Sequence, residues 1–211
     1  MQFTPKIQKA INVASLAHQN QKRVGLDLPY IVHPFAVMLI IAEFRDNEDL
    51  LCAALLHDIV EDNLEYTREI VSSEFGESVA TIVDYVTETR TVDTNGQFME
   101  SWDERKAKYL ARLSEASENA VILSAGDSIQ NLNSLVETYR KCGPEIWKSF
   151  GASINKKLNY YRQVEQIVQK RTDCKIKNAL KESLSRLEAI LKSNSFSNQS
   201  ILLSQSSVNS V

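Results

Sequence analysis

Residues 50–62 read LLCAALLHDIVED, a stretch that sets two polar groups, His57 and Asp58, inside an apolar run. A run of this kind is typical of a helix that is buried in a core. Burying an imidazole beside a carboxylate costs several kcal/mol unless both groups are hydrogen-bonded, paired or bound to a metal. Two interpretations follow: a divalent cation held by both side chains, or a hydrogen-bonded core histidine beside a surface aspartate.

Helical patterns continue in both directions from this stretch. Thr4 and Pro5 form an N-cap followed by a first-turn proline, and Pro34 opens a second apolar segment. Gly76 is a typical helix-ending residue, and Ser101 is a typical cap. These signals predict an all-α fold with loops at 25–29 and 87–97. The helices are expected at 5–21, 34–44, 46–61, 67–75, 77–86, 102–113, 120–140, 144–169 and 180–191.

The composition is that of an ordinary soluble globular protein. Of 211 residues 43% are hydrophobic and 24% charged, and the net charge of −3 provides no basic field for nucleic acid or an anionic membrane. We expect no signal peptide, because residues 1–6 lack a basic stretch followed by an apolar one, and the apolar run 36–42 is far too short to span a bilayer. Cys52, Cys142 and Cys174 are widely spaced, which favours reduced thiols. We expect a cytoplasmic protein without nucleic-acid or membrane partners.

The C-terminal part changes character. Four leucines at residues 180, 184, 187 and 191 recur at helical spacing, and their face is expected to pack either on the domain or on a second copy in a homo-oligomer. From Ser193 to Val211 there is no charged side chain, and too few apolar groups are present to offset the entropy of ordering. The predicted organisation is a domain at 1–170, an amphipathic helix at 171–192 and a disordered tail at 193–211.

Two further residues complete a candidate metal site with His57 and Asp58. His33 lies directly before Pro34 at the start of a helix, and Asp127 ends the apolar stretch VILSAG. Two imidazoles and two carboxylates suit Mn²⁺, Fe²⁺, Co²⁺ or Zn²⁺, and they leave coordination positions for water and a phosphate. Structural zinc would prefer cysteine ligands, and no cysteine is close to these positions in a suitable pattern. Mn²⁺ is the expected cofactor.

An acidic pair, Glu61 and Asp62, follows His57 by about one helical turn. Beside a cation, these carboxylates could take a proton from an attacking water or give one to a leaving group. The alternative is a solvated acidic helix end. That alternative places negative charge at the unfavourable end of the helix dipole, so we favour a catalytic role.

Four segments resemble the HD superfamily of metal-dependent phosphohydrolases: HP at 33–34, AALLHDIVED at 53–62, FGESVA at 75–80 and GD at 126–127. Within it, the likeness is closest to the hydrolase domain of RelA/SpoT proteins and to small alarmone hydrolases. The resemblance implies a single-domain, multi-helix HD fold. It also implies that the metal ligands are His33, His57, Asp58 and Asp127. The Glu61–Asp62 pair is a narrower signal, since it typifies the branch that hydrolyses (p)ppGpp.

Flanking segments extend the resemblance to about residues 5–168. AHQNQKR at 17–23 and PYIVHP at 29–34 imply that Arg23 lies against the nucleotide base and that Tyr30 helps to build the pocket. A solvated loop arginine is the alternative for Arg23. Asn131 matches the family's pattern, and Ser134 stands where a small polar residue contacts the ribose. ERKAKYL at 104–110 resembles stand-alone bacterial HD hydrolases.

The segment after Asp127 departs from the family's pattern. Ser128 replaces a basic residue, and Gln130 replaces a histidine. Losing a cation beside the site would weaken phosphate binding or the support of the metal ligands. These two positions therefore bear on the identity of the substrate.

The resemblance implies a guanosine-3′,5′-bis(diphosphate) 3′-pyrophosphohydrolase. It would convert (p)ppGpp or a related alarmone to a nucleoside 5′-phosphate and pyrophosphate. Two alternatives stay open: a less specific HD nucleotidase or phosphodiesterase, and a nucleotide-binding regulatory module with weakened catalysis. A small-molecule nucleotide is the expected partner in all three cases.

Overall fold

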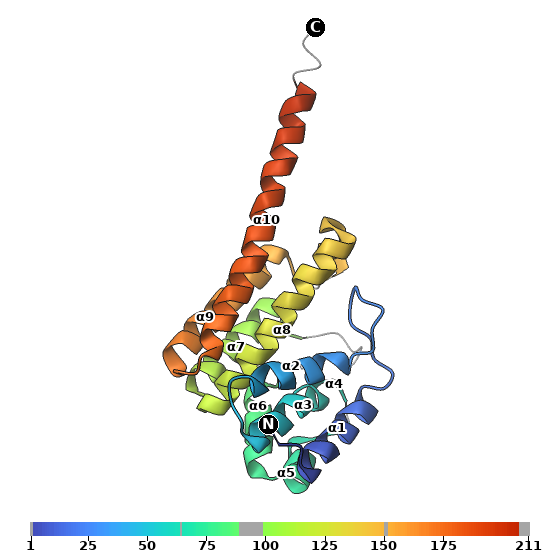
Figure 1. Cartoon of the computed structure of the whole chain (residues 1–211), viewed down its shortest axis with the longest axis vertical. Coiled ribbons are helices and arrows are strands. Elements are labelled where there is room, and N and C mark those ends of the chain that lie inside the picture. Colours follow the sequence, from blue (N-terminus) through green and yellow to red (C-terminus); the bar gives the residue numbers. More distant parts are fainter. Residues whose placement is uncertain (1, 64, 89–98, 150–151, 207–211) are drawn as a thin grey trace.

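The computed structural model describes residues 2–63, 65–88, 99–149 and 152–206, and within these ranges the chain is all-α (Figure 1). The prediction of an all-α fold is confirmed. The helices in order are α1 (Pro5–Ala17), α2 (Val32–Ala42), α3 (Glu48–Leu56), α4 (Ile59–Asp62), α5 (Arg68–Phe75), α6 (Glu77–Val86), α7 (Trp102–Glu115), α8 (Glu118–Cys142), the 3-10 helix η1 (Pro144–Ser149), α9 (Ile154–Arg171) and α10 (Ile176–Ser206). In the described ranges, β-type pairing occurs as an isolated antiparallel bridge between Lys22 and Pro29.

Side-chain caps fix several helix starts where the sequence predicts them. The side chains of Thr4, Asn47 and Thr67 each accept a hydrogen bond from a backbone N–H of the first turn. Ser101 and Glu104 form a reciprocal capping box at the start of α7. Between α5 and α6 the chain turns at Gly76, whose φ of 92° favours glycine. Most of the loop predicted at 87–97 lies outside the described residues.

The structure differs from the prediction of one helix at 46–61. α3 ends at Leu56 and α4 begins at Ile59, so the chain breaks at His57 and Asp58. In an unbroken helix, neighbouring side chains point about 100° apart. Both residues keep right-handed helical backbone angles at this interruption, and Oδ2 of Asp58 lies 3.2 Å from Nε2 of His57.

The prediction of one helix at 144–169 is also wrong. Pro144 opens the short 3-10 helix η1, and a new helix, α9, begins after Ser153. The side chain of Ser153 accepts a hydrogen bond from the backbone N–H of Lys156. This N-cap favours the start of a new helix at Ile154.

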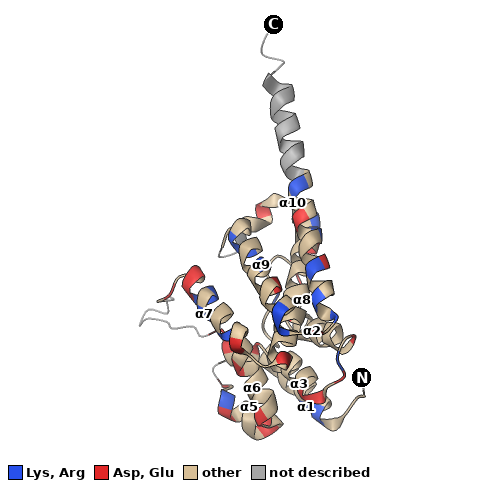
Figure 2. Cartoon of the chain, turned by 90° about the vertical axis from the view of Figure 1, so that its left-hand side faces the viewer, with Lys and Arg blue, Asp and Glu red and all other residues tan. Residues whose placement is uncertain are grey.

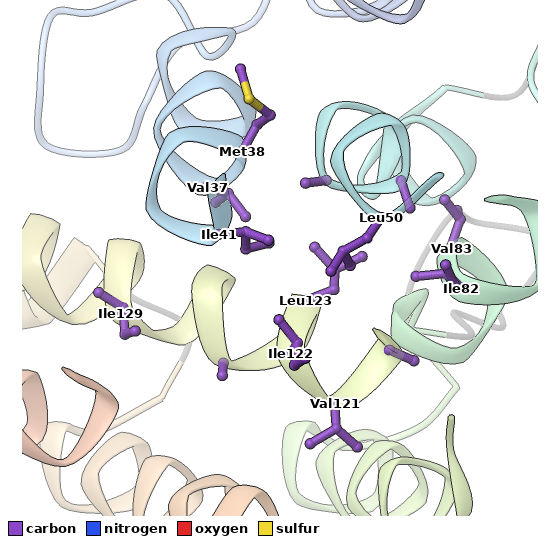
Figure 3. Packing of buried hydrophobic residues seen from close by; sticks show 14 of the residues in the cluster. Val37, Met38, Ile41, Leu50, Ile82, Val83, Val121, Ile122, Leu123 and Ile129 are labelled. Atoms are coloured by element: carbon purple, nitrogen blue, oxygen red, sulfur yellow. The ribbon is translucent and has the colours of Figure 1, made fainter. Parts of the chain in front are cut away.

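The core forms where α2, α3 and α6 pack on the first half of α8 (Figure 3). Val37 and Ile41 of α2 face Ile122 and Leu123 of α8 across this core, and all four side chains are essentially buried. A Cβ atom at Gly126 would lie 2.6 Å from Cγ1 of Ile41, so α2 and α8 approach closely at that point. This contact lies directly before the candidate ligand Asp127 on α8 and about two helical turns from the candidate ligand His33 on α2.

α10 packs against α8 and α9 and then projects beyond the other helices (Figure 1). Its residues Ile176, Leu180, Leu184 and Leu187 are buried within this chain, so this face packs on the domain itself. The helix continues past Lys192 to Ser206, into the segment predicted to be disordered. Extending a formed helix costs far less than nucleating one, and Ser, Asn and Gln lower helix propensity only modestly. The domain boundary at residue 170 stays a prediction.

Acidic and basic residues are interspersed over the helices (Figure 2). Among the described residues, no helix combines the length and apolar character that crossing a bilayer requires.

Candidate metal centre

Four side chains from three parts of the fold converge on one point. His33 lies in the first turn of α2, His57 and Asp58 lie at the break after α3, and Asp127 lies in the middle of α8. The Nε2 atoms of the two histidines are 3.3 Å apart. Oδ2 of Asp58 lies 3.4 Å from Nε2 of His33 and 3.2 Å from that of His57. Oδ1 of Asp127 lies 3.2 Å and 3.8 Å from the same two nitrogens.

Hydrogen bonds on the far side of each imidazole orient both rings. Nδ1 of His57 donates to the backbone oxygen of Ala54 at 2.8 Å, and Nδ1 of His33 donates to Oε1 of Gln130 at 2.6 Å. Because each Nδ1 faces an acceptor, Nε2 of each ring points into the cluster, where its lone pair is available to a cation once the proton is lost. Histidines that bind metals in proteins are held in this way.

The two carboxylates of the cluster favour a positive charge between them. Burial disfavours the imidazolium of His57, but the carboxylates of Asp58 and Asp127 outweigh burial and raise its pKa to about 9. The pKa of His33 is raised for the same reason. Burial favours the neutral acids, yet the two histidines lower the pKa of both Asp58 and Asp127. The site therefore holds two carboxylates whose charge is balanced by protons or by a cation, and two imidazoles with two carboxylates suit a divalent metal.

Two of the predicted substrate-binding residues hydrogen-bond the carboxylates. The hydroxyl of Tyr30 donates to Oδ2 of Asp58 at 2.7 Å, and Nδ2 of Asn131 donates to Oδ1 of Asp127 at 2.6 Å. Burial, followed by the charge of Asp58, raises the pKa of Tyr30, so its phenol stays protonated as a donor.

A cavity of about 180 Å³ opens directly on the cluster. Glu61 of the predicted catalytic pair lines it, and Oε2 of Glu61 accepts the backbone N–H of Glu88 at 2.9 Å. Asp62 lies close enough to Tyr30 to raise the pKa of that phenol. The cavity is lined by Tyr30, His33, His57, Asp58, Glu61, Val86, Glu88, Lys106, Tyr109, Leu123, Asp127, Asn131 and Tyr160.

A second cavity of about 160 Å³ adjoins the first, and Tyr30 and Asn131 line both. Arg23 and Ser134 line the second cavity, so all four predicted substrate-binding residues lie on its wall. Arg23 is tied into the fold by hydrogen bonds, which differs from a solvated loop arginine. The remaining lining residues are Lys22, Val24, Leu135, Thr138, Lys157 and Tyr161.

The motif around Arg23 has a visible structural role. The His18 ring is buried, lies 4.9 Å from the Tyr30 ring, and bonds Oε1 of Gln21 through Nδ1 at 2.6 Å. The backbone N–H of Tyr30 donates to the oxygen of Gln21 at 2.9 Å. These contacts shape the turn that carries Arg23 and Tyr30 to the cavities.

The sequence did not single out the Glu88–Lys106 ion pair, whose two residues line the metal cavity. Lys106 donates to Oε2 of Glu88 at 2.6 Å, and Arg105 donates to Oε1 of the same carboxylate at 2.6 Å. Nζ of Lys106 also lies 4.8 Å from the centre of the Tyr160 ring. Burial lowers the pKa of Lys106, but the charge of Glu88 outweighs it and raises that pKa. The ERKAKYL segment contained this lysine, whereas nothing local to the sequence marked Glu88.

The two departures after Asp127 have different structural consequences. Ser128 is buried, with its hydroxyl lacking a partner in the described structure, so this position does not supply a cation to the cavity. Gln130 provides the acceptor that His33 needs. The support of the metal ligand is therefore retained by a different side chain.

Sequence comparison finds a family model described as "HD domain", which matches residues 10–154. A probable GTP pyrophosphokinase of Mycobacterium leprae is 47% identical over 91 residues, which cover 41% of this chain and 11% of that protein. A guanosine-3′,5′-bis(diphosphate) 3′-pyrophosphohydrolase of Vibrio cholerae is 45% identical over 80 residues, covering 38% of this chain and 11% of that protein. The matches thus span only a small part of these longer relatives.

Two solved structures share the fold of this chain. A solved structure described as a metazoan ortholog of SpoT that hydrolyzes ppGpp superposes with a TM-score of 0.70 at 22% identity. The match covers 88% of this chain and 97% of that one. A protein of Listeria monocytogenes matches with a TM-score of 0.61 at 23% identity, covering 74% of this chain and 97% of the other.

Proposed function

Because this chain belongs to the HD domain family, we propose that it is a metal-dependent phosphohydrolase that removes the 3′-diphosphate of (p)ppGpp or a closely related alarmone. The observation that carries the proposal is the convergence of two imidazoles and two carboxylates on a cavity that Glu61 also lines. Relatives from Vibrio cholerae and Aquifex aeolicus named as 3′-pyrophosphohydrolases support this choice of reaction. The products are a nucleoside 5′-phosphate and pyrophosphate.

In this proposal His33, His57, Asp58 and Asp127 hold one divalent cation, and Mn²⁺ is the proposed metal. Nitrogen and carboxylate donors with room for further ligands suit it. A bound cation supplies the Lewis acidity that polarises a phosphoryl group and makes water a better nucleophile. The chain's own contribution is to fix the donors through the hydrogen bonds to Ala54, Gln130, Tyr30 and Asn131.

Glu61 and Asp62 manage protons in the proposed reaction. Water attacks the phosphorus that is bonded to the ribose O3′, the P–O3′ bond breaks, and the water oxygen leaves with pyrophosphate. Glu61, which lines the cavity and is anchored by the N–H of Glu88, accepts the proton of the water. Asp62 passes a proton to the leaving O3′, and the proton that Glu61 took from the water replaces it, so the pair returns to its starting state.

The second cavity is the proposed pocket of the nucleoside. Arg23 can stack on a base through its planar guanidinium, and Ser134 offers a hydroxyl to the ribose. Lys106 supplies positive charge on the side of the metal cavity where phosphate oxygens would lie. Three cysteines that remain free thiols support a cytoplasmic location, which is part of the proposal.

The test is turnover of purified, Mn²⁺-loaded protein with ppGpp and ppApp. Pyrophosphate release is followed with a coupled assay, and the nucleotide product is identified by anion-exchange chromatography. Protein treated with EDTA and the Asp127→Asn variant are the controls, and both should be inactive. Absence of turnover of any alarmone by protein with metal bound would overturn the proposal. Turnover of nucleoside monophosphates or cyclic nucleotides instead would identify a less specific HD hydrolase.

A further inference from the structure

A single guanidinium contacts the three side chains that lie between the metal cluster and the second cavity. Nη2 of Arg23 donates to Oε1 of Gln130 and to Oδ1 of Asn131, both at 3.1 Å. The guanidinium carbon lies 5.5 Å from the centre of the Tyr30 ring. The backbone N–H of Arg23 donates to the oxygen of Leu28 at 3.0 Å, so the turn itself is fixed.

Each of these three side chains in turn bonds a different member of the metal cluster. The pairs are Gln130 with His33 at 2.6 Å, Tyr30 with Asp58 at 2.7 Å, and Asn131 with Asp127 at 2.6 Å. The three paths end on ligands from α2, from the break after α3 and from α8. Arg23 is therefore linked to three of the four proposed ligands through one intervening side chain each.

The guanidinium also determines which end of each amide faces the cluster. Asn131 must present its NH₂ group to the carboxylate of Asp127, and its oxygen is then directed at Arg23. Gln130 must present its oxygen to the Nδ1–H of His33, and the same oxygen accepts from Arg23. A flipped amide would set oxygen against carboxylate or NH₂ against N–H, and an arginine donor on the outer side disfavours both flips.

We propose that Arg23 is a positioning residue of the metal centre, acting through Gln130, Asn131 and Tyr30, in addition to lining the nucleoside pocket. This inference rests on the part of the proposed function that assigns a cation to the cluster. It does not depend on which nucleotide is hydrolysed. Hydrogen-bond partners of metal ligands are each worth about 10- to 100-fold in metal affinity, so a side chain that orients three of them has a measurable effect from outside the ligand set.

The experiment measures Mn²⁺ binding to the whole chain of 211 residues without nucleotide. Arg23→Met keeps the length of the side chain and removes its donors, and Lys9→Met removes an exposed cation that pairs with Glu74 and lines neither cavity. By isothermal titration calorimetry we expect the Kd of Mn²⁺ to rise about 10- to 100-fold in Arg23→Met and less than about twofold in Lys9→Met. The visible spectrum of the Co²⁺-substituted protein should shift in Arg23→Met alone, because it reports ligand geometry.

A second variant covers the case in which Arg23→Met does not fold. Arg23→Lys keeps the charge and one donor group, and it should give an intermediate Kd and an intermediate Co²⁺ spectrum. Wild-type Mn²⁺ affinity and a wild-type Co²⁺ spectrum in folded Arg23 variants would overturn the inference. Wild-type protein that binds Mn²⁺ but hydrolyses no alarmone would overturn the proposed function and leave this inference standing, so the two failures are distinguishable.

Discussion

Glu61 is the residue on which the proposed chemistry depends most directly. Glutamine at this position keeps the acceptor for the N–H of Glu88 but cannot take a proton. We expect Glu61→Gln to lower kcat for alarmone hydrolysis by about 10²- to 10⁴-fold, with Mn²⁺ affinity changed less than about twofold. Steady-state pyrophosphate release and calorimetry measure the two quantities.

The matched control is Glu65→Gln, since Glu65 is exposed and lies only four residues further along the chain. It should keep wild-type kcat. Retention of kcat in Glu61→Gln would remove Glu61 from the proton transfer.

The raised pKa of His57 leads to a prediction of how Mn²⁺ affinity depends on pH. Its pKa is raised from 6.5 to about 9 in the metal-free protein, so the imidazolium stabilises the fold below pH 6.5 and that contribution is lost as the pH rises through about 9. A cation needs the neutral imidazole, and its binding releases this proton. We expect Mn²⁺ affinity to rise at least about tenfold per pH unit between pH 6.5 and 8.5, because His57 gives up one proton and His33, whose pKa is also raised, gives up a further one wherever it is protonated.

Calorimetry in two buffers of different ionisation enthalpy measures the number of protons released. An affinity that does not change with pH would show that His57 is neutral before the metal binds.

At the scale of residues, the sequence predicts site residues where polar side chains stand inside an apolar run. His57 and Asp58 stood out because an apolar helix cannot bury both cheaply, and the structure brings them together with His33 and Asp127. Glu88 and Lys106 had no such signal, because they meet only after α6 and α7 have folded against each other. Gln130 departs from the family's histidine, which in sequence bears on the identity of the substrate, and in the structure it supplies the acceptor that His33 requires.

At the scale of elements, α2 and α8 approach closely at Gly126, the residue directly before the proposed ligand Asp127. A methyl group at position 126 would meet Cγ1 of Ile41 at 2.6 Å, so in Gly126→Ala either the Ile41 side chain or the two helices must shift. Overpacking of this kind costs about 1–3 kcal/mol, while replacing glycine within a helix returns about 1 kcal/mol. We therefore expect Gly126→Ala to lose little stability. Its Mn²⁺ affinity should fall about tenfold or more, which is the effect of disturbing the groups that orient a metal ligand.

A double-mutant cycle with Ile41→Ala tests the mechanism. Ile41→Ala alone leaves a cavity and should destabilise the protein by about 2–5 kcal/mol. In the double variant the methyl group at position 126 occupies part of that space, so the two effects should be less than additive, as measured by urea denaturation. Strict additivity would mean that the two positions do not contact each other as the structure has them.

The elements themselves were predictable to the extent that their ends carry caps. Thr4, Asn47, Thr67 and Ser101 set helix starts because each satisfies a backbone N–H of the first turn. The break between α3 and α4 was not predictable in this way, since no proline or glycine interrupts LLHDIVED. The convergence of His57 and Asp58 with ligands from α2 and α8 accompanies that break, so it depends on tertiary contacts that periodicity does not contain.

At the scale of the molecule, the metal site joins segments that are far apart in sequence. Its proposed ligands come from α2, from the α3–α4 break and from α8, and α8 also carries the contacts of α9 and α10. A cation bound to all of them binds the native state and not the unfolded chain, so it must stabilise the whole fold. At a free Mn²⁺ concentration of about 100 times Kd the stabilisation is about 2.7 kcal/mol.

For a chain of 211 residues, this stabilisation corresponds to a rise in Tm of about 5–10 °C. Asp127→Asn keeps the shape of the side chain and an oxygen that can accept from Asn131, but it removes one charged ligand. We expect its Tm to be nearly independent of Mn²⁺, as followed by circular dichroism. The exposed variant Glu65→Gln should respond like the wild type. An equal rise in Tm in Asp127→Asn would mean that Mn²⁺ stabilises the protein from another site, because the loss of a ligand must weaken a site that contains it.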